Sequence, residues 1–159
     1  MNVITSLKTL EIARNPSRRY RIGNVSTLED IPEVLKACSA HFILLIAIDA
    51  SSIEDERISV IAKTLLSRGL AGFSVWGPDC SRVHDLFDLE RDPDESDETL
   101  VVTTWHENEP ISEAVCYFDL NAYPSSDFES DCSDWVTIAV GSESWEEEIS
   151  AALTKGFDD

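Results

Sequence analysis

The sequence predicts an α/β fold, a single-domain three-layer sandwich whose four-stranded, mainly parallel sheet is covered by helices as in flavodoxin-like and Rossmann-like proteins. Four apolar segments rich in β-branched residues alternate with segments whose apolar residues recur at helical spacing. The first apolar segment is almost continuous, which is typical of a strand buried on both faces. The length of 159 residues suits one domain.

The first strand is expected at residues 41–49, where His-Phe-Ile-Leu-Leu-Ile-Ala-Ile-Asp leaves no polar face. Ser51 or Ser52, each three residues ahead of an acidic residue, predicts a capping box that opens a helix. That helix is expected to end at Gly69. Its apolar face holds Ile58, Ile61, Ala62 and Leu65.

The same unit then repeats along the chain. Residues 71–76 predict a second strand, with 77–79 as turn and N-cap and a helix that buries Val83, Leu86 and Phe87. Residues 100–105 predict a third strand, and Pro110 suits the first position of the next helix. The apolar face of that helix holds Ile111, Ala114, Val115 and Phe118.

The fourth unit follows a polar loop at 121–133. Residues 135–140 predict a strand, and Ser144 with Glu147 predicts a capping box for a last helix that ends at Gly156. Repeated strand–helix units imply right-handed crossovers and a parallel sheet. For the four strands in chain order we expect the spatial order 2-1-3-4, which places helices on both faces.

The N-terminal part of the chain has a weaker pattern. We expect residues 1–40 to form an extension or an edge element of an α/β domain at 41–159. Residues 20–22 suit an additional edge strand, and residues 27–36 suit a short helix broken near Pro32.

Acidic residues outnumber basic ones by 31 to 12, for a net charge of -19. Nearly all of this excess lies in residues 92–154, which contain seventeen Asp or Glu and no Lys or Arg. This balance disfavours nucleic acid and anionic membranes as partners. Either the charge only solvates the surface, or it attracts a protein partner with a basic surface. With no apolar run of membrane-span length and no secretory signal, a cytoplasmic location is expected.

The densest acidic segment, residues 92–98, is expected to be an exposed loop. It resembles a calcium-binding loop only superficially, because it lacks the central glycine and the bidentate Glu at the twelfth position. We predict no metal site and no cofactor. The candidate acidic surface comprises Asp92, Asp94, Glu95, Asp97 and Glu98.

The four cysteines are far apart, with no C-x-x-C pair, and reduced thiols are therefore expected. Ligands of parallel sheets bind beyond the carboxyl ends of the strands. The polar and aromatic residues at those ends are the candidate binding residues, although caps and turns also favour Asp and Ser there. They are Asp49, Ser51, Trp76, Asp79, Cys80, His84, Trp105, His106 and Glu107.

Several of these candidates have a chemical interpretation beside a structural one. Cys80 at a helix start, with His84 one turn later, has the arrangement of a nucleophile and its base, although the adjacent Asp79 disfavours a thiolate. His106, Glu107 and Asp49 could supply metal ligands or an acid–base pair. Complete catalytic signatures such as H-E-x-x-H, G-x-G-x-x-G or a P-loop lysine are absent from the sequence.

The segments Trp-Gly-Pro-Asp-Cys at 76–80, Val-His-Asp at 83–85 and Thr-Thr-Trp-His at 103–106 resemble a family of short, uncharacterised bacterial α/β proteins. A closing Val-Gly-Ser-Glu-Ser-Trp at 140–145 extends the resemblance, which covers about residues 41–153. The resemblance implies a bacterial cytosolic protein and carries no activity.

Two functions therefore compete. The first is a small acidic protein-binding module, such as an immunity-type inhibitor or a non-catalytic subunit of a bacterial defence or regulatory complex, with tryptophans as interface anchors. The second is an enzyme that processes a nucleotide or phosphoester at the carboxyl edge of the sheet. The missing signatures favour the non-enzymatic interpretation.

Overall fold

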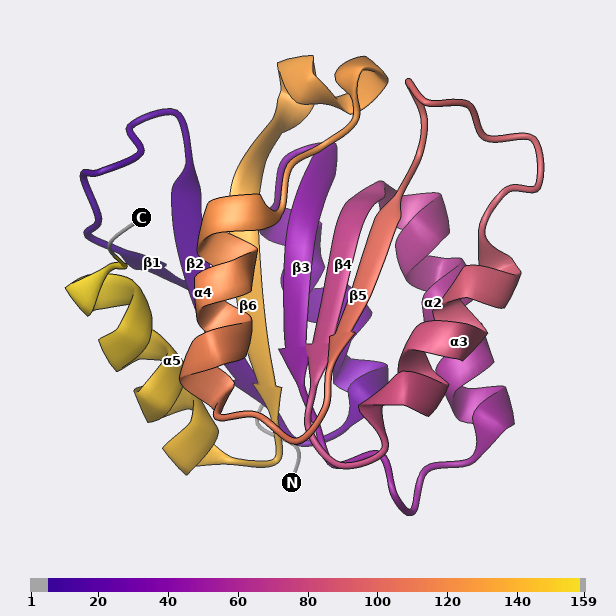
Figure 1. Ribbon diagram of the computed structural model, residues 1–159, viewed down its shortest axis with the longest axis horizontal. Coiled ribbons are helices and arrows are strands. Elements are labelled where there is room, and N and C mark those ends of the chain that lie inside the picture. Colours follow the sequence, from indigo (N-terminus) through magenta and orange to yellow (C-terminus); the bar gives the residue numbers. More distant parts are fainter. Residues whose placement is uncertain (1–5, 158–159) are drawn as a thin grey trace.

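The computed structural model describes residues 6–157 and contains one six-stranded sheet with helices on both faces (Figure 1). The sheet order is β1-β2-β6-β3-β4-β5, and every neighbouring pair is parallel except β1 and β2. The predicted mainly parallel α/β sandwich is confirmed, but the count of four strands is wrong because the N-terminal part adds two. The strands are β1 (Lys8–Leu10), β2 (Arg19–Val25), β3 (His41–Ala47), β4 (Leu70–Trp76), β5 (Val102–His106) and β6 (Cys132–Val140).

The helices form two layers. The short helix α1 (Ile31–Val34), α2 (Asp55–Arg68) and α3 (Cys80–Glu90) pack on one face of the sheet. Helices α4 (Ile111–Asn121) and α5 (Glu143–Lys155) pack on the other. Three 3₁₀ helices lie at Leu28–Asp30, Leu35–Ala37 and Ser126–Asp131. Within residues 6–157, no helix combines the length and apolar character of a membrane span.

Strand β3 explains the continuous apolar run of the sequence. Phe42, Leu44 and Ile46 belong to the core beneath α2 and α3. Ile43 and Leu45 belong to the core beneath α4 and α5. All five side chains are fully buried, so this strand has no polar face, as the sequence predicts for a central parallel strand.

The expected strand order 2-1-3-4 is wrong. The four predicted strands lie in the order fourth, first, second, third, since β6 is followed by β3, β4 and β5. From β3 to β5 the chain advances in one direction, with α2 and α3 on one face. Helix α4 then returns the chain across the other face, and β6 enters between β2 and β3. Local apolar periodicity does not encode which distant strand becomes a neighbour.

The helix starts differ from the sequence patterns in three places. The capping box expected at Ser51 or Ser52 is wrong, because α2 begins at Asp55 with Glu54 as its N-cap. The backbone N–H of Ser51 instead donates to the carboxylate of Asp49 (3.0 Å), which stabilises a turn ahead of the helix.

At the last helix, the hydroxyl of Ser142 accepts from the backbone N–H of Trp145 (3.1 Å). Ser142 is therefore the N-cap of α5, and the box expected at Ser144 is two residues too late. Pro110 is the N-cap of α4 rather than its first residue. The C-caps at Gly69 and Gly156 are confirmed.

The N-terminal part contributes a parallel strand inside the sheet. The strand expected at 20–22 extends over 19–25, and it is not at the edge because β1 pairs along its outer side. The helix expected at 27–36 is divided into 3₁₀ and α segments around Pro32.

The N-terminal arginines bind two buried carboxylates from the acidic half of the chain. Arg19 makes a bidentate pair with Asp134 (2.8 and 2.7 Å), whose carboxylate also accepts from the backbone N–H of Ser39 (2.7 Å). Asp119 accepts from the hydroxyl of Tyr20 (2.5 Å) and lies 3.2 Å from Arg14. Both carboxylates are almost completely buried, and buried charges require such partners.

Replacing Asp134 with alanine should lower the free energy of unfolding by about 3 kcal/mol, because the change removes a buried carboxylate that accepts hydrogen bonds from Arg19 and from the backbone N–H of Ser39. Urea unfolding followed by circular dichroism measures this effect. The matched control is Asp127→Ala, which removes an exposed carboxylate and should leave the stability nearly unchanged. Equal effects of the two substitutions would contradict a structural role for Asp134.

Candidate functional site

The topology creates crevices wherever the chain leaves two neighbouring strands toward opposite faces of the sheet. Three neighbouring pairs meet this condition: β2 and β6, β6 and β3, and β4 and β5. Each pair has a cavity at its carboxyl ends, which lie at the bottom of Figure 1. The pair β3 and β4 lacks this divergence, because α2 and α3 pack on the same face.

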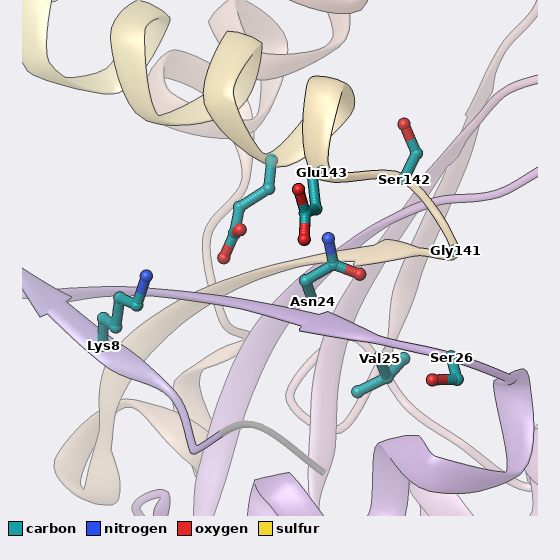
Figure 2. Close-up of a pocket in the computed structure, with 8 residues that line it drawn as sticks. Lys8, Asn24, Val25, Ser26, Gly141, Ser142 and Glu143 are labelled. Atoms are coloured by element: carbon teal, nitrogen blue, oxygen red, sulfur yellow. The ribbon is translucent and has the colours of Figure 1, made fainter. Parts of the chain in front are cut away.

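The cavity between β2 and β6 has a volume of about 470 Å³. Figure 2 shows Lys8 at one end of it, and the side chain of Asn24 close to that of Glu143 at the start of α5. Ser26, Ser142 and Glu146 complete its polar lining, and Val25 and Gly141 line it as well. Two carboxylates and one ammonium group make the lining mildly acidic.

The other two cavities lie on either side of β3 and β4. The cavity between β6 and β3, about 390 Å³, is lined by Asp49, Arg57 and Trp145 among others. Arg57 is already held by a bidentate pair with Glu29 (3.0 and 2.6 Å). The cavity between β4 and β5 is larger, about 620 Å³.

The largest of these cavities brings together four of the predicted site residues. Trp76, Asp79, His106 and Glu107 line it, although they come from two different strand–helix connections. Asp49 lies in the neighbouring cavity. The remaining four predicted site residues line none of the three cavities in the described part of the chain. They are Ser51, Cys80, His84 and Trp105.

Both ring nitrogens of His106 have protein partners. Nδ1 lies 2.7 Å from a carboxylate oxygen of Glu109, and Nε2 lies 3.1 Å from the hydroxyl of Thr104. The ring also packs against Tyr117, with the centroids 5.0 Å apart. The carboxylate that contacts His106 is thus Glu109, whereas Glu107 is exposed and accepts from the hydroxyl of Ser81 (3.2 Å).

Cys80 and His84 lie inside the molecule rather than at an open site. Burial raises the pKa of the Cys80 thiol, and the charge of Glu107 raises it further. The ring of His84 lies 3.0 Å from Asp85 and 3.1 Å from Thr103. A buried thiol with a raised pKa is a poor nucleophile, so this pair is better explained as part of the core.

Asp79 and Asp49 stabilise turns. Asp79 has left-handed backbone angles (φ 64°) and accepts from Arg82 (2.8 Å), which also pairs with Asp55 (2.6 Å). Hydrogen bonds from Ser51 lower the pKa of Asp49 below its ordinary value.

Trp105 differs from Trp76 in its exposure. It lies on the edge strand β5, where 48 % of its surface is accessible, and its ring packs against that of His84 with centroids 4.4 Å apart. Trp76 is half-buried, and its indole N–H donates to the backbone carbonyl of Glu109 (2.8 Å).

Sequence reasoning missed three of the polar or aromatic side chains that line the largest cavity. Asn108 and Glu109 belong to the connection that already contained His106 and Glu107, so the position of that loop after a strand was an available signal. Trp145 follows the end of β6 by five residues and meets Trp76 edge to face, with centroids 5.1 Å apart. Only the strand order brings those two rings together.

The acidic loop lies at the opposite edge of the sheet. Figure 1 shows the 91–101 connection and the 3₁₀ helix at 126–131 together at the top, by the amino ends of the strands. The backbone N–H of Asp127 donates a hydrogen bond to the backbone carbonyl of Glu98 (3.0 Å). The hydroxyl of Ser125 donates to the backbone carbonyl of Leu100 (2.5 Å). We call the joined carboxylates the amino-edge acidic surface: Asp92, Asp94, Glu95, Asp97, Glu98, Asp127, Glu129 and Asp131.

Few basic groups reach the amino-edge acidic surface. Within residues 6–157 its ion pairs are Arg91 with Glu95 (3.2 Å) and His41 with Asp131 (3.9 Å). Seven of the eight residues are exposed, Glu95 being the exception. No group of three or more His, Cys, Asp or Glu side chains in the described part of the chain is arranged to hold a metal ion.

The thiols give a direct test of the interpretation of Cys80. Burial raises the pKa of Cys38 to about 11 and that of Cys132 to about 12, and it also raises the pKa of Cys80. At pH 8 we expect iodoacetamide to label Cys80 in the folded protein more slowly than in the urea-unfolded chain. Mass spectrometry of the digested protein measures the rates, and preferential labelling of Cys80 in the folded state would instead indicate a nucleophile.

Comparison with known proteins yields a family and a fold. A family model described as "Domain of unknown function (DUF7684)" matches residues 20–156. This match confirms the resemblance to an uncharacterised family and extends it to include β2. No curated protein matches the chain.

Among solved structures, the chain is similar to a UDP-N-acetylmuramoyl-L-alanyl-D-glutamate–2,6-diaminopimelate ligase. The TM-score is 0.56 at 11 % sequence identity, and the match covers 95 % of this chain. The chain spans less than a third of the ligase, 31 % of its length. A likeness at this identity is one of fold alone.

Proposed function

Since the chain belongs to the DUF7684 family, whose function is unknown, we propose its function from the arrangement of its own side chains. We propose a small cytoplasmic protein-binding module whose amino-edge acidic surface engages a basic partner. An immunity-type inhibitor, or a non-catalytic subunit of a bacterial defence or regulatory complex, works in this way.

The observation that carries this proposal is the joining of two acidic segments that are distant in the sequence. Two hydrogen bonds hold the 92–98 loop beside the 126–131 3₁₀ helix. They run from Asp127 to Glu98 and from Ser125 to Leu100. The eight carboxylates meet only Arg91 and His41 as ion-pair partners in the described chain. Like charges held together repel one another, and a basic surface relieves that repulsion.

Three arginines near the N-terminus pair with buried carboxylates and do not neutralise the amino-edge acidic surface. Arg19 is committed to Asp134, and Arg14 and Arg18 lie against Asp119. The excess negative charge therefore remains at the exterior, where it increases the rate of encounter with a positively charged protein.

The strand that follows the acidic loop exposes an apolar side chain near each of its ends. β5 is the outermost strand on its side of the sheet, and Val102 (43 %) and Trp105 (48 %) are exposed along it. Exposed tryptophan is a frequent anchor of protein interfaces. Val102 lies at the end of β5 that is next to the acidic loop, and Trp105 lies three residues closer to the carboxyl end, about 10 Å farther along the strand. Trp105 is accordingly the proposed apolar anchor for a partner that extends from the charged surface along β5.

The alternative, processing of a nucleotide or phosphoester at the carboxyl edge, has one favourable observation. Cavities are present at all three points where neighbouring connections diverge, which is where parallel sheets bind ligands. The charges support this alternative less well, because Glu143 and Glu146 line one cavity and Glu107 and Glu109 line another. Carboxylates repel phosphate unless a cation lies between them.

Neutralising three exposed carboxylates of the amino-edge acidic surface tests the proposal. Asp94→Asn, Asp97→Asn and Glu98→Gln combined should weaken binding to the partner about tenfold, because each exposed ion pair contributes a fraction of 1 kcal/mol. The partner is first captured from lysate with the unaltered chain and then purified for titration calorimetry. Binding should weaken as salt rises from about 0.1 M to about 1 M, where the Debye length falls to about 3 Å.

A second triple variant provides the control. Glu113→Gln, Glu147→Gln and Glu148→Gln remove the same charge from exposed positions on α4 and α5. This variant should keep nearly the full affinity. Equal weakening by both triple variants, or failure to capture any basic partner at low salt, contradicts the proposal.

A further inference from the structure

The cavity at the carboxyl ends of β4 and β5 has a lining that suits a positively charged small group. Two indole rings, Trp76 and Trp145, and three carboxylates, Asp79, Glu107 and Glu109, line it, with no Lys or Arg among its described lining residues. We propose that this cavity binds an organic cation that carries an ammonium or guanidinium group. The site is independent of the proposed function, because the amino-edge acidic surface lies at the other edge of the sheet.

The two indole rings pack against each other edge to face. Their planes are nearly perpendicular (87°), and their centroids are 5.1 Å apart. The ring of Trp76 is held by its N–H bond to the carbonyl of Glu109 (2.8 Å), so binding requires no reorientation of that ring. Organic cations are attracted to the faces of aromatic rings, and tryptophan binds them most strongly.

Two of the three carboxylates of the cavity lie beside an arginine or a histidine side chain, and the third, Glu107, has no ion pair among the described residues. Asp79 pairs with Arg82 (2.8 Å), and Glu109 lies 2.7 Å from a ring nitrogen of His106. Glu107 is exposed, and its only described contact is the hydroxyl of Ser81 (3.2 Å). A cation in the cavity would gain Glu107 as a partner, whereas a phosphate would be repelled by it.

The backbone of the cavity is shaped by unusual conformations. Asp79 (φ 64°) and Asn108 (φ 59°) are the two non-glycine residues with positive φ in the chain from 6 to 157, and both line this cavity. Gly77 (φ 126°) lines it too, and a Cβ there would lie 1.9 Å from the carbonyl oxygen of Ile48. For the two non-glycine residues this conformation costs free energy, and such residues gather at binding sites. The volume of about 620 Å³ is typical of a small-molecule site.

The experiment is a titration followed by nuclear magnetic resonance of the indole N–H groups. The probe is n-butylguanidinium, and its neutral isostere n-butylurea is the matched control ligand. Of the four tryptophans in the chain, Trp76 and Trp145 should show saturable shifts with the guanidinium compound and none with the urea compound. Shifts of equal size with both compounds, or no saturable shift with n-butylguanidinium, overturn the proposal.

Two substitutions locate the binding. Glu107→Gln keeps the size of an exposed side chain and should weaken binding roughly threefold, and Trp145→Phe should weaken it by a similar factor. Glu98→Gln, the same change on the amino-edge acidic surface, should leave the affinity unaltered. If Glu107→Gln binds as tightly as the unaltered chain, the cation does not lie in this cavity.

A final experiment distinguishes a cation on a partner protein from a free small-molecule cation. A blocked Gly-Arg-Gly tripeptide carries the same guanidinium group on a polypeptide. If it displaces n-butylguanidinium, the cavity receives a side chain of a partner protein; if only the free compound binds, the ligand is a small molecule. The variant with three neutralised amino-edge carboxylates should bind n-butylguanidinium with unaltered affinity. Failure of the partner experiment and failure of the cation titration are therefore distinguishable.

Discussion

The insertion of β6 between β2 and β3 is the constraint on which the rest of the structure depends. Asp134, near the start of β6, is completely buried and binds Arg19 from β2 and the backbone of Ser39 just ahead of β3. A buried carboxylate without partners costs several kcal/mol. The arrangement that places β6 beside both partners is therefore favoured over an order that separates them.

Both candidate surfaces follow from that insertion. To reach the centre of the sheet from the edge strand β5, the chain must return across the face opposite α2 and α3. This return through α4 makes the connections after β4 and β5 diverge, and α5, which follows β6 on the same face, diverges from the connections after β2 and β3. Each of the three places has a cavity at the carboxyl edge. At the amino edge it brings the 126–131 segment against the loop that precedes β5.

The distribution of charge between interior and exterior explains why a chain with net charge -19 presents bare carboxylates. The four N-terminal arginines at positions 14, 18, 19 and 21 lie against the buried carboxylates of Asp119 and Asp134. The outer carboxylates are left with few cations. Seven of the eight carboxylates at the amino edge are exposed, and a protein partner is proposed there. At the carboxyl edge Glu107 lines a cavity together with two indole rings, and a small cation is proposed there.

The sequence by itself determined the α/β class, the parallel pairing of the central strands and the approximate position of each strand–helix unit. These properties follow from local patterns: burial on both faces of 41–47, helical spacing of apolar residues, and glycine at helix ends. It also located Trp76, Asp79, His106 and Glu107, because parallel strands share one carboxyl edge. Only the tertiary structure decided the strand order, the burial of Cys80 and the meeting of Trp76 with Trp145. Those features depend on contacts between residues far apart in the chain, for which hydrophobic periodicity carries no information.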